Sequence, residues 1–197
     1  MNSRFSALFA CAALFFGITA SADVRIVMLR HAEKPDAGLG QLNCQGLNRA
    51  LALPKVLLAA YGKPDAIYAP DPHVEKEDRG MLYNYVRPLA TIEPMAIRVG
   101  LPVRTSWGWN DIQGLQAELL DPVHEGQTLL VAWEHHKLDE LARNLLKARS
   151  VDTAGLPRWK SEDFDSIYVL TLKPGGGGAF RRDAEGLDGL SQSCPDR

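Results

Sequence analysis

An arginine and a histidine, Arg30 and His31, stand directly after an apolar run of strand length, residues 24–29. If this run is a parallel strand of an open α/β sheet, the residues after it lie at the edge where such folds bind ligands. The planar guanidinium of arginine suits phosphate oxygens, and imidazole can act as a nucleophile. The pair therefore predicts an imidazole aimed at a phosphoryl group.

A second apolar run, residues 128–133, ends in Glu134, His135 and His136. The carboxyl ends of parallel strands lie on one edge of a sheet, so this group could face the same cleft as His31. Two strand ends that carry histidine, one of them beside an arginine, favour a functional role over a purely structural one. Adjacent residues leave a strand end in different directions, so we expect only one of the two neighbouring histidines to reach a phosphate.

The elements that would position these groups alternate between strand and helix patterns along the chain. Apolar runs predict strands, and apolar residues at helical spacing predict helices. The expected strands are 24–29, 65–69, 128–133 and 166–172. The expected helices lie within 44–58, with Asn43 as its N-cap, and within 86–95, 111–120 and 138–146. This order predicts an α/β fold, a three-layer sandwich with a mainly parallel central sheet and helices on both faces. Gly175–Gly178 is read as a turn before an antiparallel edge strand near Phe180.

Residues 1–22 have the features of an export signal. Arg4 supplies positive charge, residues 7–16 are apolar, and Ala20-Ser21-Ala22 resembles a cleavage site. The apolar stretch is short for a membrane span, so we expect cleavage that leaves no stable membrane anchor. The predicted protein is periplasmic or secreted, and residues 23–197 have the length of a single domain.

The net charge does not favour nucleic acid as a partner, and the cysteine content leaves open whether a disulfide forms. The net charge of −2 gives no basic bias toward nucleic acid. Cys44 and Cys194 lie outside the predicted signal. In an oxidising compartment they could pair, but cysteines far apart in sequence need not meet in space, so both states remain open. The sequence carries no signal for an oligomeric state.

Five segments of the chain resemble motifs of the histidine phosphatase superfamily, also called the phosphoglycerate mutase-like family. They occur in family order across nearly all of residues 23–197, and the short, exported form is similar to a small exported bacterial branch. The segments are Arg30-His31-Ala32 for the R-H-G triplet, 42–50 for the "L-T-x-x-G-x-x-Q-A" helix start, 65–68 for the "D-x-I-Y" strand, 87–94 for the "R-x-x-x-T-A-x-P" helix, and 131–135 for the "V-x-S-H-G" strand end.

The resemblance implies a phosphomonoester hydrolase that needs no cofactor and no metal ion. His31 would attack phosphorus and form a phosphohistidine, which water then hydrolyses. Arg30 and Arg87 would bind the non-bridging oxygens, and His135, directly after its strand, would donate to the charge of the transition state. The partner would be a small phosphorylated substrate.

The chain departs from the family in two places. The polar segment 73–79 separates the second strand from Arg87 and is predicted to be a solvated loop rather than a substrate-gripping lid. The glutamate that donates a proton in many relatives is also missing from its usual setting. Asp111 is the candidate catalytic acid nearby, and Glu33 and Glu134 compete with it.

Two other functions remain open from the sequence. The first is a phosphate-binding or sensing module that keeps the pocket with little or no turnover. The second is a metal-dependent hydrolase that uses His31, His135, His136 and a carboxylate. The second lacks the HExxH spacing of a helical zinc site and gives Arg30 and Arg87 no role.

Overall fold

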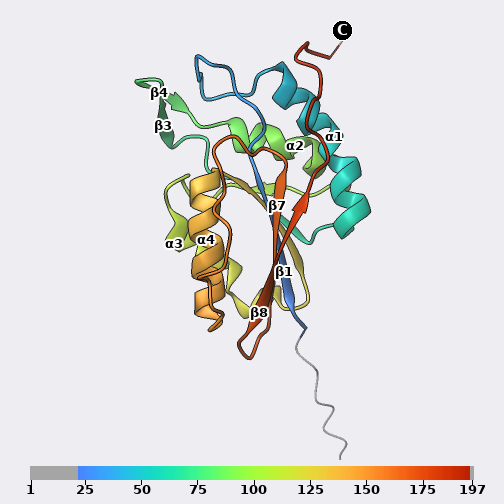
Figure 1. Ribbon diagram of the computed structural model, residues 1–197, viewed down its shortest axis with the longest axis vertical. Helices are drawn as coiled ribbons and strands as arrows, with labels where there is room; N and C mark the ends of the chain where they lie inside the picture. The colour runs from blue at the N-terminus through green and yellow to red at the C-terminus, as the bar shows by residue number, and fades with distance from the viewer. Residues whose placement is uncertain (1–21, 196–197) are drawn as a thin grey trace, which may run out of the picture.

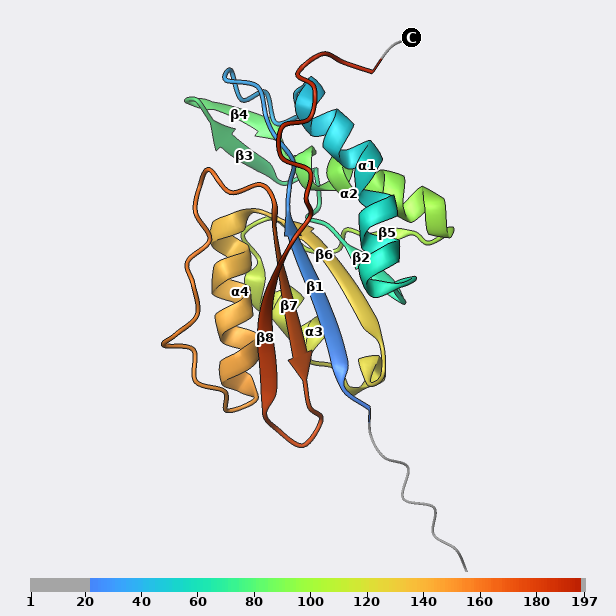
Figure 2. The same cartoon turned by 45° about the vertical axis from the view of Figure 1, so that its right-hand side comes forward.

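A six-stranded sheet in the order β5-β2-β6-β1-β7-β8 forms the middle layer of the molecule (Figures 1 and 2). The computed structural model describes residues 22–195, so the predicted export signal lies outside the described residues except for Ala22. No helix among the described residues is long and apolar enough to cross a membrane.

The elements follow the predicted alternation, with one additional hairpin. The strands are β1 (Val24–Arg30), β2 (Ala66–Tyr68), β3 (Glu75–Asp78), β4 (Met81–Asn84), β5 (Val103–Arg104), β6 (Thr128–Trp133), β7 (Ser166–Leu172) and β8 (Gly178–Ala184). The helices are α1 (Cys44–Tyr61), α2 (Arg87–Val99), α3 (Ile112–Leu119), the short 3-10 helix η1 (Pro122–His124) and α4 (His135–Ala148).

The sheet is mainly parallel, as predicted. Strands β1, β6, β2 and β5 run in one direction, and β7 pairs antiparallel with β1. The edge strand β8 pairs antiparallel with β7, in agreement with the strand expected near Phe180. In the β1–β6 register, Arg30 lies opposite Trp133. The residues after these two strands therefore leave the sheet side by side.

Helices cover both faces of the sheet because the central strands are apolar on both sides. In β1, Ile26 and Met28 pack with α3 and α4, whereas Val27 and Leu29 pack with α1 and α2. Such a fully buried run is typical of parallel strands between two helical layers. The two cores hold β1 rigidly and fix the direction in which the chain leaves its carboxyl end.

Helix α1 begins at the N-cap that the sequence predicted, and a disulfide joins its first residue to the C-terminal tail. The side chain of Asn43 accepts a hydrogen bond of 2.8 Å from the backbone N–H of Gly46. A side chain at position 46 would collide with the backbone of Glu33, so this position requires glycine. Cys44 and Cys194 form a disulfide with their Cα atoms 4.4 Å apart, which settles the question left open by the sequence.

The segment predicted to be a solvated loop is instead the β3–β4 hairpin, so that prediction was wrong. Burial alternates along β3: Asp78 is buried and Lys76 is half-buried, whereas Glu75 and Glu77 are exposed. Arg79 and Gly80 form the two-residue turn with positive φ angles of 57° and 80°, as primed hairpin turns require. The hairpin lies beyond the carboxyl end of β1 (Figure 2).

The disulfide yields a prediction about stability. Replacing both cysteines, as Cys44→Ser with Cys194→Ser, should lower the free energy of unfolding by about 2–4 kcal/mol because the unfolded chain regains conformational freedom. Urea unfolding monitored by tryptophan fluorescence measures the change. Reduction of the wild-type protein should give the same loss, and an unchanged midpoint in both samples would contradict the prediction.

Candidate active site

His31 lies just beyond β1 with one ring nitrogen committed to the backbone. The backbone N–H of His31 donates to the carbonyl of Trp133 at 3.0 Å, which ties the residue to the end of β6. The ring Nδ1 lies 2.8 Å from the carbonyl oxygen of Ala32. A carbonyl only accepts, so Nδ1 carries the proton and Nε2 keeps its lone pair. Burial, reinforced by Arg30 and Arg87, holds the pKa of His31 well below its usual value, and the imidazole is neutral.

Arg30 is fixed beside His31 by the loop between α4 and β7. Its Nη1 donates to the carbonyl of Ser161 at 2.5 Å and to that of Asp163 at 3.2 Å, and its guanidinium lies 3.7 Å from the ring centre of Phe164. Burial lowers the pKa of Arg30 to about 10, so it remains charged. Its Nε is buried without a hydrogen-bond partner among the described residues, which leaves a donor for an anion.

Arg87 is the first residue of α2 and is held by a carboxylate of the hairpin. Its Nη1 donates to Oδ2 of Asp78 at 2.5 Å, and Oδ1 of Asp78 accepts from Lys34 at 2.7 Å. Burial acts to raise the pKa of Asp78, but the hydrogen bonds from Lys34 and Arg87 outweigh it and keep the carboxyl ionised. The Nε of Arg87, like that of Arg30, is buried without a partner in the part of the chain described.

Thr91 connects Arg87 to the His31 segment. Its hydroxyl donates to the carbonyl of Arg87 at 2.8 Å and accepts from the backbone N–H of Ala32 at 2.9 Å. A threonine four residues after the arginine lies one helical turn away on the same face. This geometry gives the physical reason for the Arg87-to-Thr91 spacing noted in the sequence.

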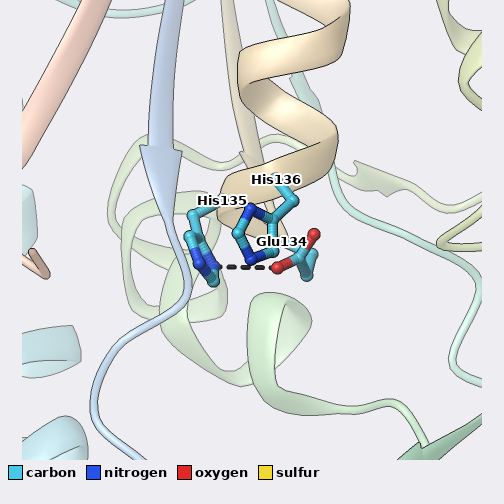
Figure 3. A group of neighbouring side chains, drawn as sticks. All are labelled: Glu134, His135 and His136. Atoms are coloured by element: carbon cyan, nitrogen blue, oxygen red, sulfur yellow. Dashed lines mark ion pairs between the residues drawn. The ribbon is translucent and has the colours of Figure 1, made fainter. Parts of the chain in front are cut away.

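Glu134 and His135 form an ion pair at the start of α4 (Figure 3). Oε1 of Glu134 lies 2.8 Å from Nδ1 of His135, and Oε2 caps the helix by accepting from the N–H of Lys137 at 3.0 Å. Burial acts to raise the pKa of Glu134, but His135 and the backbone donors outweigh it and lower it to about 2. Nε2 of His135 lies 3.2 Å from the hydroxyl of Ser161. His136 is exposed and stacks on His135 with ring centres 4.0 Å apart.

These groups line one cleft of about 310 Å³ at the carboxyl edge of the sheet. The lining combines residues from β1, the hairpin, the start of α2, the start of α4 and the loop before β7. Its members are Arg30, His31, Lys34, Lys76, Glu77, Asp78, Tyr85, Arg87, Glu134, His135 and Ser161.

Comparison with solved structures identifies the architecture. The protein histidine phosphatase SixA complexed with tungstate matches 82% of this chain and 97% of its own length, with a TM-score of 0.59 and 16% identity. Phosphoglycerate mutase from Plasmodium falciparum matches 89% and 99%, with a TM-score of 0.55 and 16% identity. Mycobacterial glucosyl-3-phosphoglycerate phosphatase matches 81% and 97%, with a TM-score of 0.51 and 18% identity. The chain has the histidine phosphatase fold. No protein-family model and no curated protein sequence matches it.

Within this histidine phosphatase fold, most of the residues singled out from the sequence come together, but Asp111 does not join them. Arg30, His31, Arg87 and His135 all line the cleft. Asp111 does not, because its carboxylate caps α3 by accepting from the N–H of Gly114 at 2.9 Å and is exposed there. Asp111 therefore does not belong to the cleft that holds His31.

The competing carboxylates are also engaged. Glu33 is not among the residues that line the cleft, and it pairs with Arg49 at 2.8 Å. Arg49 is buried and also pairs with Asp165, Glu185 and Asp188, so Glu33 belongs to a network that ties α1 to the C-terminal tail. Glu134 lines the cleft but is ionised and paired with His135.

Among the described residues, one group of side chains could hold a metal ion. The ligand atoms of Glu134, His135 and His136 lie within 4.8 Å of one another (Figure 3). His31 is not a member of this group, so the geometry does not favour the metal-dependent alternative, which needs His31 as a ligand.

Several residues of the cleft were missed from the sequence. Lys76 and Asp78 come from the hairpin, and Tyr85 follows it directly. The signal for the first two was present as the alternation of charge across a segment with an Arg-Gly turn. Ser161 and Lys34 lie in loops, where nothing in the local pattern marks them.

The Thr91 link yields a second prediction. Thr91→Val keeps the shape of the side chain but leaves the buried N–H of Ala32 without an acceptor, which should cost about 1–3 kcal/mol of unfolding free energy. Thr91→Ser keeps the oxygen and serves as the control. Denaturant titration of the three proteins measures the effect, and equal stability of the valine and serine variants would disprove the role of this bond.

Proposed function

We propose that the protein is a phosphomonoester hydrolase in which Nε2 of His31 is the nucleophile. The observation that carries the proposal is the arrangement around this atom. A buried, neutral imidazole has its Nδ1 proton committed to Ala32, and it lines the same cleft as the buried guanidinium groups of Arg30 and Arg87, whose Nε atoms have no partner among the described residues. Phosphoryl transfer needs a nucleophile and fixed positive charges around the transferred group.

The proposed reaction has two steps. Nε2 of His31 forms a bond to phosphorus while the ester P–O bond breaks, and water then attacks the phosphohistidine and breaks the P–N bond. Arg30, Arg87 and His135 bind the equatorial oxygens, where negative charge develops. Unaided hydrolysis of phosphomonoesters is among the slowest reactions known, so a preorganised set of cationic donors supplies much of the acceleration. The proposal requires no metal ion.

The substrate we propose is a small phosphorylated molecule. The cleft volume lies at the small end of the range for ligand sites. Tungstate, present in the SixA complex, is a tetrahedral oxyanion like phosphate. We also propose that the protein is exported to the periplasm or secreted, and the Cys44–Cys194 disulfide supports this because such bonds persist in oxidising compartments.

One observation favours a second candidate, a phosphate-binding module with little turnover. Asp78 and Glu134, the buried carboxylates of the cleft, are both ionised in ion pairs, so neither has a proton to donate to a leaving group. Tight binding of phosphate or vanadate without release of product from any phosphomonoester would favour this candidate.

The proposed nucleophile gives a direct prediction. His31→Ala should abolish phosphate release because the variant lacks the proposed nucleophile. Rapid quench with ³²P-labelled substrate should trap an acid-labile phosphoenzyme in the wild-type protein and none in the variant. His73→Ala, which removes an exposed histidine outside the cleft lining, is the control. A fully active His31→Ala protein would exclude the phosphohistidine route.

The proposed anion pocket gives a further prediction. Arg87→Lys keeps the charge but loses the planar pair of donors, so turnover should fall by about ten- to a thousandfold, the scale for one lost oxyanion donor. Arg98→Lys, at an exposed arginine of the same helix, is the matched control and should change little. Steady-state kinetics measure the activity of both variants, and equal activity of the two would refute the pocket.

The wild-type protein gives an independent test. Its activity should survive a chelator and be inhibited by vanadate.

A further inference from the structure

Among the described residues, the two buried carboxyl groups of the cleft are both held in ion pairs and are not available to protonate a leaving group. Both oxygens of Asp78 are engaged, one by Lys34 and one by Arg87. Both oxygens of Glu134 are engaged as well, one by His135 and one by the N–H of Lys137. Glu77 also borders the cleft, but it is exposed and lies on the opposite face of β3 from Lys76 and Asp78. An alkoxide leaves poorly without a proton, so hydrolysis of an alkyl phosphate here needs a different donor.

Lys76 is a cation of the cleft with no carboxylate partner among the described residues. Its ammonium lies 3.6 Å from the ring centre of Trp109 and 5.7 Å from that of Tyr85. Tyr85 in turn contacts the ring of His31 edge-on, with ring centres 6.1 Å apart. His31 and Lys76 therefore both lie near the same buried tyrosine, and all three residues line the cleft.

The position of Lys76 is fixed from both ends of its strand. The indole N–H of Trp109 donates to the carbonyl of Glu75 at 3.0 Å, and the carbonyl of Trp109 accepts from the indole of Trp133 at 2.8 Å. At the other end, Asp78 is bound to Arg87. The hairpin is thereby attached to β6 on one side and to α2 on the other, with the lysine between the two attachments.

We propose that Lys76 is the catalytic acid, which donates a proton to the leaving-group oxygen. This assignment rests on the proposed phosphatase function. As Nε2 of His31 bonds to phosphorus and the P–O bond breaks, the ester oxygen takes a proton from the ammonium. The neutral amine then accepts a proton from the water that attacks the phosphohistidine. The products are an alcohol and phosphate, and His31 and Lys76 return to their starting states.

The electrostatic surroundings suit such a role. Burial lowers the pKa of Lys76 below its ordinary 10.5, and Arg87 and Lys137 also lower it, while Glu134 and Asp78 oppose them. An acid is most effective when its pKa approaches the working pH. Because the protonated form is the active one, kcat/KM for alkyl phosphates should fall as pH rises through this lowered pKa.

The test compares leaving groups that do and do not need a proton. Lys76→Met and Lys76→Arg should each lower kcat/KM for an alkyl phosphate by about 10²–10⁴-fold, yet change that for p-nitrophenyl phosphate by less than about threefold. Arginine keeps the positive charge but does not release its proton near neutral pH. The basic limb of the alkyl phosphate pH profile should also disappear in both variants. Unchanged phosphoenzyme formation from p-nitrophenyl phosphate would show that the variants are folded.

A matched variant distinguishes proton donation by Lys76 from the effect of its positive charge. Lys34→Met removes a positive charge from the same cleft and should cause a similar loss with both leaving groups. If Lys76→Arg restores alkyl phosphate hydrolysis, or if the Lys76→Met loss is equal for both substrates, Lys76 acts through its charge and the assignment is wrong. A wild-type protein that hydrolyses neither substrate would overturn the proposed phosphatase function together with this assignment.

Discussion

The parallel pairing of β1 with β6 is the constraint on which the candidate site depends. With Arg30 opposite Trp133, the chain leaves both strands at the same level, and His31 and Glu134-His135 enter one cleft. The N–H of His31 bonded to the carbonyl of Trp133 continues this pairing one residue beyond the strand. A shift of register by one residue would turn every side chain to the other face, so the two apolar cores that fix the register also fix the site.

The site buries two positively charged guanidinium groups, and each of them needs hydrogen-bond acceptors from other elements of the fold. Arg30 is held by backbone carbonyls of the loop before β7, and Arg87 by the carboxylate of Asp78. Each guanidinium nevertheless retains a buried Nε without a partner in the described chain. An unpaired buried donor is destabilising, and a bound oxyanion would satisfy both. Burial, reinforced by the same cations, lowers the pKa of His31 and keeps its imidazole neutral.

The β3–β4 hairpin is the part of the site that does not belong to the sheet. It contributes Asp78, which orients Arg87, and Lys76, which has no carboxylate partner in the described residues. Its attachment through Trp109 and Arg87 places it over the carboxyl edge of the sheet rather than free in solvent. Arg30, His31 and Arg87 are thus positioned by the sheet and its helices, whereas the hairpin adds Lys76 and Asp78 to the same cleft.

The sequence by itself determined the strands, the order of the layers and the position of His31, because apolar runs and the residues that follow them are local patterns. It also determined Asn43 as an N-cap, which depends on a residue three positions away. Only the tertiary structure decided that Asp111 caps a helix, that Cys44 meets Cys194, and that Lys76 lies near Tyr85 and Trp109. The partner of a carboxylate, a thiol or an ammonium is chosen by proximity in space, and that proximity arises only when distant segments pack together.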